Sequence, residues 1–237
     1  MSTQIHWKKV SWIAWMVILM GVWHTPAPAF QLGGRDTKDW IERLERPDRI
    51  KDLKIEEVLA NLNLKPGLII ADIGAGSGVF SRPLAKAVAP TGKVFSVDID
   101  QGLLDYIAQR AKQEKIQNIQ PVLGKFDDPN LPTRQVDLVF IHDVLHHIKN
   151  RQTYLKNLAT YLKPDARIAL IEMNSEDPNT PHHDQPDLQL GKDQVNQWLE
   201  TDGFHPAEEF DLFEGKKWFV IYSREAAPSH EDMDHMM

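Results

Sequence analysis

The sequence predicts an α/β protein with a doubly wound, mostly parallel, Rossmann-like sheet. Short apolar runs alternate with helix-like segments from residue 68 to residue 173, and such alternation is typical of parallel strands joined by crossover helices. A glycine-rich turn, Gly74 to Gly78, directly follows one of these runs, as at a tight strand-to-helix connection. Acidic residues stand where several runs end, at the sheet edge where open α/β sheets bind their ligands.

Residues 1–29 have the layout of a secretory signal peptide. Lys8 and Lys9 precede 14 mostly apolar residues, Val10 to Trp23, and Ala27-Pro28-Ala29 then offers small residues to a signal peptidase. The apolar run is shorter than the ~20 residues that a membrane span needs. We expect cleavage after Ala29 and a periplasmic or secreted protein without stable membrane insertion. The alternative is an uncleaved anchor in the inner membrane.

Composition narrows the classes of partner. The chain carries 27 basic and 34 acidic residues, a net charge of −7, and loss of the two lysines in residues 1–29 would bring it to −9. An acidic domain without basic clusters is not expected to bind nucleic acid, because phosphate contacts need Lys and Arg. Because the sequence contains no cysteine, disulfides, thiolate chemistry and a lipoprotein anchor are excluded.

Residues 30–50 are predicted to form a linker and a lid helix. In the segment Asp36–Arg46, the side chains of Trp40, Ile41 and Leu44 share one face and charged residues occupy the rest. Such a helix would pack over a ligand pocket, contact a substrate, or do both.

The main domain, residues 51–224, is expected to begin with a helix and to continue with alternating strands and helices. The expected helices are 53–62, 79–89, 101–115, 151–162 and a segment around 195–199. The expected strands of the alternating part are 68–73, 93–98, 119–123, 136–141 and 167–173. Two further strands, 208–213 and 218–222, flank the turn Glu214-Gly215-Lys216 and predict a C-terminal hairpin.

The glycine-rich turn predicts a pocket for a nucleoside cofactor. At Gly74, Gly76 and Gly78, the missing Cβ lets the backbone approach a ligand closely. The helix that follows points its N-terminal N–H groups into the same space. An ordinary tight turn is the alternative, but the next strand also ends in an acid, Asp98, and this combination favours a cofactor site.

Two carboxylates favour S-adenosylmethionine as that cofactor. The glycine spacing is G-x-G-x-G, whereas dinucleotide-binding turns have G-x-G-x-x-G. Asp72 stands two residues before the first glycine, where a carboxylate would repel a pyrophosphate but attract an ammonium or a sulfonium group. Asp98, at the tip of the next strand, can accept hydrogen bonds from both ribose hydroxyls. A dehydrogenase is disfavoured for the same reasons.

Several motifs together resemble those of class I S-adenosylmethionine-dependent methyltransferases. They are Asp72–Gly78, Val97–Asp100, Val136–Phe140 followed by His142–His147, and Leu162-Lys163-Pro164 before a strand. The resemblance covers about residues 50–224. The segments Glu42–Arg49 and Asp127–Pro132 further resemble a bacterial subgroup of uncertain substrate, often with export signals. This resemblance implies a seven-stranded sheet with a C-terminal antiparallel hairpin, and S-adenosylmethionine as the cofactor.

Motif order and charge together assign the cofactor site. Asp72 would orient the methionine end of the cofactor, Asp98 would hold the ribose, and the three glycines would form the turn. The residues assigned to the cofactor are Asp72, Gly74, Gly76, Gly78, Asp98, Phe126, Asp127 and Asp128.

The sequence departs from the family pattern at two positions. Lys125 stands where many members have an acid near the adenine, so that role would pass to Asp127 or Asp128, with Phe126 against the purine face. Asp165 stands where the turn before the fifth strand usually has glycine, which Asp can replace because it tolerates a left-handed conformation.

Three residues are assigned to the methyl acceptor side. Methyl transfer from a sulfonium is an in-line displacement, so the enzyme mainly aligns donor and acceptor and excludes water. Asp143, at the tip of the fourth strand, is expected to face the methyl group. His146 or His147 could act as a base, because imidazole titrates near neutrality. The alternative for both histidines is packing or helix capping.

Two histidine-containing segments raise the question of metal binding. His182-His183-Asp184 lies in a long loop, Asn174 to Gly191, of the kind that often forms a lid or a binding loop. A metal site there would need further ligands, such as Glu172, and no recognised ligand spacing is present, so no metal site is predicted. The tail His230–Met237 combines imidazole and thioether groups that suit weak copper binding, or it is a disordered terminus.

The sequence therefore predicts an S-adenosylmethionine-dependent methyltransferase that acts on a small molecule. The alternative is an exported, non-catalytic ligand- or metal-binding protein with the same fold. An exported enzyme would need a supply of its cofactor across the membrane. The acceptor and the oligomeric state are not predicted.

Overall fold

The computed structural model describes residues 36–224. The expected signal peptide and the Met/His-rich tail lie outside the described residues, as does the linker part of residues 30–35. Within residues 36–224, no helix is long and apolar enough to cross a bilayer.

The fold is a seven-stranded sheet in the order β3-β2-β1-β4-β5-β7-β6. Strands β1 to β5 are parallel, and β7 pairs antiparallel with both β5 and β6. The strands are β1 (Ile69–Ile73), β2 (Lys93–Asp98), β3 (Ile119–Leu123), β4 (Val136–His142), β5 (Leu162–Met173), β6 (His205–Phe210) and β7 (Lys217–Ser223). This arrangement confirms the predicted fold class.

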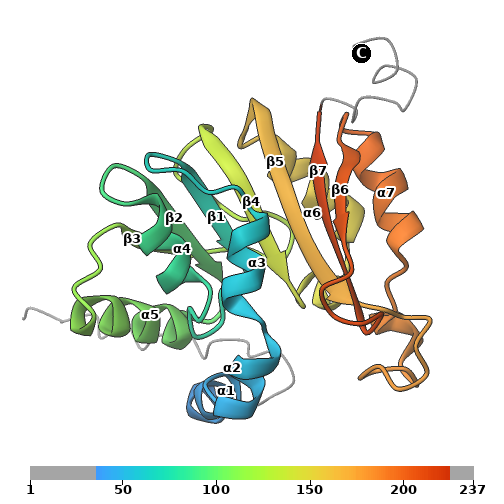
Figure 1. Ribbon diagram of the computed structural model, residues 1–237, viewed down its shortest axis with the longest axis horizontal. Coiled ribbons are helices and arrows are strands. Elements are labelled where there is room, and N and C mark those ends of the chain that lie inside the picture. Colours follow the sequence, from blue (N-terminus) through green and yellow to red (C-terminus); the bar gives the residue numbers. More distant parts are fainter. Residues whose placement is uncertain (1–35, 225–237) are drawn as a thin grey trace, which may run out of the picture.

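Helices cover both faces of the sheet (Figure 1), and each face has its own apolar core. The alternation along β1 explains this division, because Ile70 packs toward one core and Ala71 and Ile73 pack toward the other. Helices α3 and α4 contribute to the core that contains Ile70, whereas α6 and α7 contribute to the opposite one. The helices are α1 (Thr37–Leu44), α2 (Pro47–Asp52), α3 (Ile55–Asn61), α4 (Ser81–Val88), α5 (Gln101–Gln113), α6 (Arg151–Ala159) and α7 (Lys192–Glu200), with short 3-10 turns η2 (Leu145–His147) and η3 (Pro186–Leu188).

Several local predictions differ from the structure: β5 begins at Leu162 rather than at residue 167, and α6 ends at Ala159 rather than at residue 162. Helix α2 was not predicted as a separate element. The first strand of the hairpin begins and ends three residues earlier than the predicted 208–213, because Phe213 is buried in the core rather than paired in a strand. Asp165 lies in an extended, irregularly paired part of β5 and not in a left-handed turn.

The carboxyl ends of the parallel strands meet at one edge of the sheet. The strand order reverses between β1 and β4, and such a switch point leaves a crevice for ligands. Helices α1 and α2 lie at this edge, and the loop between β5 and α7 lies beyond the end of β5 (Figure 1). The candidate site is therefore framed by the strand tips, the N-terminal helices and this long loop.

Candidate active site

The glycine turn after β1 needs glycine for both backbone and packing reasons. Gly74, Gly76 and Gly78 have φ values of 66°, 55° and 74°, in the left-handed region that residues other than Gly rarely adopt. A Cβ added at Gly74 would lie 2.1 Å from Cγ2 of Val144. The residue after Asp143 therefore packs directly against the turn, and this contact joins the tips of β1 and β4.

Two carboxylates, the buried Asp72 and the half-buried Asp98, lie next to the turn. Asp72 accepts a hydrogen bond from the hydroxyl of Ser81, which in turn accepts one from the hydroxyl of Ser96 over 2.8 Å. The pKa of Asp72 is raised to about 7, mainly by burial and to a smaller extent by the nearby Asp98 carboxylate, against the effect of the Ser81 hydrogen bond. A cation placed beside Asp72 would therefore stabilise the ionised form of its carboxyl group.

Asp98 sits at the tip of β2 and binds the turn itself. Its carboxylate accepts the N–H of Gly76 over 2.9 Å and the N–H of Asp100 over 3.0 Å. Burial raises the pKa of Asp98 to about 6, although these N–H groups oppose the rise. The two acids assigned from the sequence thus converge on one backbone turn.

Helix α1, the segment expected to be a lid, contacts this turn through Leu44. A Cβ added at Gly76 would lie 3.0 Å from Cδ1 of Leu44 in α1. Two polar contacts attach α1 to the domain. Thr37 donates to Asp100 over 3.2 Å, and Glu45, just after the helix, pairs with Arg82 over 3.2 Å.

The loop after β3 approaches the tip of β2 at Asp98. The two candidate adenine acids in this loop, Asp127 and Asp128, have different surroundings. The N–H of Gly124 donates to the carbonyl of Asp98 over 2.9 Å. The carboxylate of Asp128 accepts hydrogen bonds from Tyr161 and from the N–H of Asn130, so it maintains the loop. Asp127 is exposed and Phe126 is 61% exposed, and their contacts with the adenine stay a prediction.

Asp143 connects the turn to the acceptor side. It has φ 53°, a conformation that Asp adopts more readily than most residues. Its Oδ2 pairs with the ammonium of Lys217 and lies 3.4 Å from Nδ1 of His142. Its Oδ1 is buried and lacks a hydrogen-bond partner among the described residues.

The charges and the burial around Asp143 favour an ionised carboxylate beside the neutral imidazole of His142. Burial disfavours the charged form, but the pKa of Asp143 still lies below its usual range because the Lys217 ammonium pairs with it. Burial lowers the pKa of His142 to about 3. Asp143 can therefore accept a hydrogen bond at neutral pH through its unpartnered oxygen.

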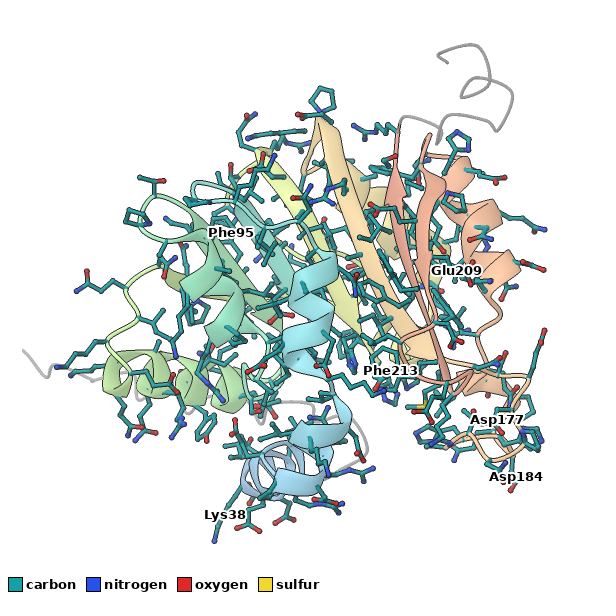
Figure 2. The ribbon with its side chains drawn as sticks, in the orientation of Figure 1. Lys38, Phe95, Asp177, Asp184, Glu209 and Phe213 are labelled. Carbon is teal, nitrogen blue, oxygen red and sulfur yellow. The ribbon has the colours of Figure 1, made fainter. Side chains whose placement is uncertain are left out.

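A cleft of about 620 Å³ opens beside Asp143. Figure 2 shows two of its lining residues, Phe213 near the lower end of the sheet and Asp177 in the long loop. The lining is rich in charge of both signs. Its charged residues are Arg43, Arg46, Asp48, Arg49, Asp52, Lys54, Asp143, Asp177, Glu214, Lys216 and Lys217. Helices α1 and α2 therefore border the acceptor side as well as the turn, and both roles expected of the lid segment are compatible with its position.

The two predicted base candidates lie to one side of this cleft. Neither His146 nor His147 belongs to its lining, so their role as a base stays a prediction. Nδ1 of His146 lies 2.7 Å from Oε2 of Glu172, and Oε1 of Glu172 accepts the N–H groups of Val144, Leu145 and His146. Glu172, considered above as a metal ligand, instead orients the η2 turn and its first histidine.

The long loop brings a third histidine to this pair. The ring of His182 lies 5.8 Å from that of His146 and 5.9 Å from that of His147, and the latter two rings are 4.0 Å apart. The pKa of His147 is lowered to about 4, mainly by burial and to a smaller extent by the other two histidines. No local pattern in the sequence predicts this cluster, because 35 positions separate His182 from His147 and no known ligand spacing joins them.

Comparison with known proteins agrees with this geometry. A family model described as a methyltransferase domain matches residues 64–203, more than half of the chain. A crystal structure of a SAM-dependent methyltransferase from Aquifex aeolicus superposes with a TM-score of 0.69 and is 25% identical, covering 80% of this chain and 98% of that chain. A magnesium protoporphyrin IX methyltransferase from Synechocystis with bound SAH shares the fold, with a TM-score of 0.57, 19% identity, and coverage of 83% and 91%.

Curated relatives match over a shorter region. A demethylmenaquinone methyltransferase from Geobacillus is 25% identical over 117 residues, which are 49% of this chain and 50% of that protein. The chain thus spans about half the length of the curated relatives that it matches.

Proposed function

We propose that this protein methylates a small polar molecule bound in the cleft beside Asp143. The premise is that the chain belongs to the family of methyltransferase domains and uses S-adenosylmethionine as its cofactor. The observation that carries the proposal is the position of Asp143. The residue after it packs on the glycine turn, and its own side chain lines the cleft of about 620 Å³.

This arrangement suits a direct transfer between two neighbouring sites. In-line displacement requires that the donor sulfonium and the acceptor atom meet in a fixed geometry. The cofactor would occupy the turn, with its cationic end near Asp72 and its ribose on Asp98. The acceptor would approach from the cleft, whose volume is in the range of small-molecule sites.

The side chains of the cleft favour a polar acceptor. Six basic and five acidic side chains line it, and burying them against an apolar ring system would cost free energy because their hydration would be lost. The unpartnered Oδ1 of Asp143 is buried, so a small shift of the cleft wall would expose it and let it accept a hydrogen bond from an O–H or N–H group of the acceptor. This bond would orient the nucleophilic atom toward the methyl group.

The test is the formation of S-adenosylhomocysteine by the purified full chain. The protein is incubated with methyl-labelled S-adenosylmethionine and fractions of a small-molecule extract, and labelled products are identified by mass spectrometry. We expect one fraction to yield S-adenosylhomocysteine and a labelled polar product in equal amounts. Asp143→Asn should lower the rate at least about 100-fold with little change in cofactor affinity.

The matched control is Asp165→Asn, an acid-to-amide change on an exposed part of β5, which should leave the rate unchanged. Cofactor binding without turnover in any fraction would reject the proposal and favour the alternative, a non-catalytic ligand-binding protein. Equal rates for the two variants would reject the role of Asp143.

Export also stays a proposal. It rests on the sequence of residues 1–29, with its basic start, apolar run and Ala27-Pro28-Ala29 site. Mass spectrometry of the protein isolated from its native cell should find an N-terminus at Phe30 in the fraction outside the cytoplasm. An intact N-terminus in the membrane fraction would instead support the anchor.

A further inference from the structure

We propose that His146, His147 and His182 form a binding site for one divalent transition-metal ion, with Zn²⁺ as the best-suited ion. One ligand nitrogen from each ring can be chosen so that all three lie within 4.8 Å of one another. They come from the η2 turn after β4 and from the long loop between β5 and α7. The inference is independent of the proposed methyl transfer.

The first support is the state of the imidazole nitrogens. Nε2 of His146 and Nδ1 of His182 are both buried and have no hydrogen-bond partner among the described residues. Buried polar atoms are almost always paired, so two unpaired nitrogens in one cluster call for a ligand. A metal ion that accepts their lone pairs would satisfy both at once.

The second support is Glu172, which prepares His146 as a ligand. Its Oε1 already accepts three backbone N–H groups, so the carboxylate is fixed as an acceptor. Nδ1 of His146, 2.7 Å from Oε2, must then carry the proton. This leaves the lone pair on the buried Nε2 of the same ring. A carboxylate behind a ligating histidine is the usual outer-shell partner of a zinc site.

The third support is the chemistry of the set. Three imidazoles with a fourth position open are a ligand set typical of catalytic zinc, and imidazole also binds Cu²⁺ and Ni²⁺. Two nitrogens bound tetrahedrally to one zinc lie about 3.4 Å apart, given Zn–N bonds of about 2.1 Å. Binding would therefore draw His182 inward. The backbone there is part of an irregular loop with φ 70° at His182.

Charges around the cluster partly offset one another. The negative charges of Glu172 and Asp143 favour a bound cation, whereas the positive charge of Arg151 disfavours it. The Arg151 guanidinium is held near the cluster because it donates to the carbonyls of Leu145 and His146. The guanidinium donates to backbone oxygens and not to the imidazoles, so the ligand nitrogens stay accessible to an ion.

A metal ion here would fix one wall of the acceptor cleft. Thr180 and Pro181, which directly precede His182, line that cleft together with Met173. The same three residues also line the small cavity that His146, His182 and Glu172 share. The ion would thus tie the long loop to the tips of β4 and β5.

The test is a zinc titration of the chelator-stripped full chain in competition with a chromophoric chelator. We expect one tightly bound Zn²⁺ per chain. His182→Ala and His147→Ala should each weaken binding at least about 100-fold, and Glu172→Gln should weaken it about 10- to 100-fold. Co²⁺ in place of Zn²⁺ should give the intense visible absorption of a tetrahedral site, and His182→Ala should abolish it.

The chain provides two matched controls. His183→Ala changes the exposed neighbour of His182, and a double substitution, His230→Ala with His235→Ala, removes the histidines of the C-terminal tail. Both should leave the tight site intact. Zinc binding that survives His182→Ala, that is lost equally in His183→Ala, or that depends on the tail would overturn the proposal, as would a wild-type chain that binds no zinc. Circular dichroism of each variant verifies that it is folded.

Discussion

On the cofactor side of the sheet edge, the glycine turn borders a cavity of only about 40 Å³, whereas the acceptor side opens into a cleft of about 620 Å³. The first is narrow because Leu44 of the lid helix lies on Gly76. Ligand sites usually measure about 300–1,000 Å³, so we expect α1 to shift when the cofactor binds. The acceptor side already has the volume of a small-molecule site.

The two sides also differ in how their charges are arranged. At the turn, the buried Asp72 and the half-buried Asp98 have no basic partner among the described residues, and the pKa of each is raised. In the cleft, Asp143 is paired with Lys217 and its pKa is lowered. The negative charge at the turn is therefore not balanced by a basic side chain of the described residues, and this suits the binding of a cationic cofactor. The cleft is nearly balanced, which suits a polar acceptor of low net charge.

The largest expected effect comes from filling the turn. Gly74→Ala would place a Cβ 2.1 Å from Val144 at a left-handed backbone position. We expect unfolding free energy to fall by about 2–5 kcal/mol and cofactor affinity to fall about 100-fold or more, measured by denaturant melts and calorimetry. Gly203→Ala is the matched control, because Gly203 has φ 81° with nothing within 4 Å of an added Cβ. It should cost about 1–2 kcal/mol and leave affinity unchanged.

That contrast marks what sequence alone could predict. The residues of the cofactor side are contiguous in the sequence, because the strand tip, the glycines and the helix follow one another within Ile69–Val88. The bounds of β2 and β3 were predicted as observed, because apolar runs ended by turn residues are local signals. Asp72 and Asp98 could be identified because each ends or nearly ends such a run.

The acceptor side depends on contacts that local patterns do not encode. Lys217 reaches Asp143 from 74 positions away, and His182 reaches His147 through a loop without periodicity. Asp128, one of the two candidate adenine acids, accepts a hydrogen bond from Tyr161, 33 positions away. The family motifs predicted that Asp143 borders the acceptor, but not that one of its oxygens would remain unpartnered. Such facts require the folded chain.

The next effect tests the electrostatic half of the comparison. Asp72→Asn removes the charge next to the expected ammonium and sulfonium. We expect affinity for S-adenosylmethionine to fall about 10- to 100-fold, because hydrogen bonds to charged groups contribute about 1.5–3 kcal/mol. Affinity for adenosine, which carries no cation, should not change. Asp98→Asn should weaken both ligands, because its carboxylate is expected at the ribose. Calorimetry that finds no loss for either variant would contradict the assignment of the two acids.

The raised pKa of Asp72 predicts a pH-dependent difference between wild type and this variant in the absence of ligand. An acid whose pKa rises on folding, here to about 7, stabilises the fold at low pH and loses that contribution as pH rises toward the folded value. His142 and His147, whose pKa values fall to about 3 and about 4, act in the opposite direction and mask the effect in wild type. Asp72→Asn lacks the titrating acid but keeps both histidines. Its stability relative to wild type should therefore rise by about 2–4 kcal/mol between pH 5 and pH 8. Denaturant melts at each pH measure this difference, and a constant difference would show that Asp72 is not the titrating group.

The smallest expected effect tests whether the lid helix controls access to the turn. Glu45→Gln weakens the contact of the lid segment with Arg82, which is 3.2 Å long and partly buried. Such a contact contributes up to about 1 kcal/mol, so cofactor dissociation measured by stopped flow should become about 2- to 5-fold faster. Glu42→Gln is the matched control, because Glu42 pairs with Lys38 on the exposed face of the same helix and should not affect dissociation. If both variants release the cofactor at the wild-type rate, Leu44 and the turn alone hold the lid, and the narrow cavity reflects packing in α1 rather than its polar attachment. If Glu45→Gln also slows methyl transfer, the lid segment affects both sides of the site, as its position between the turn and the cleft allows.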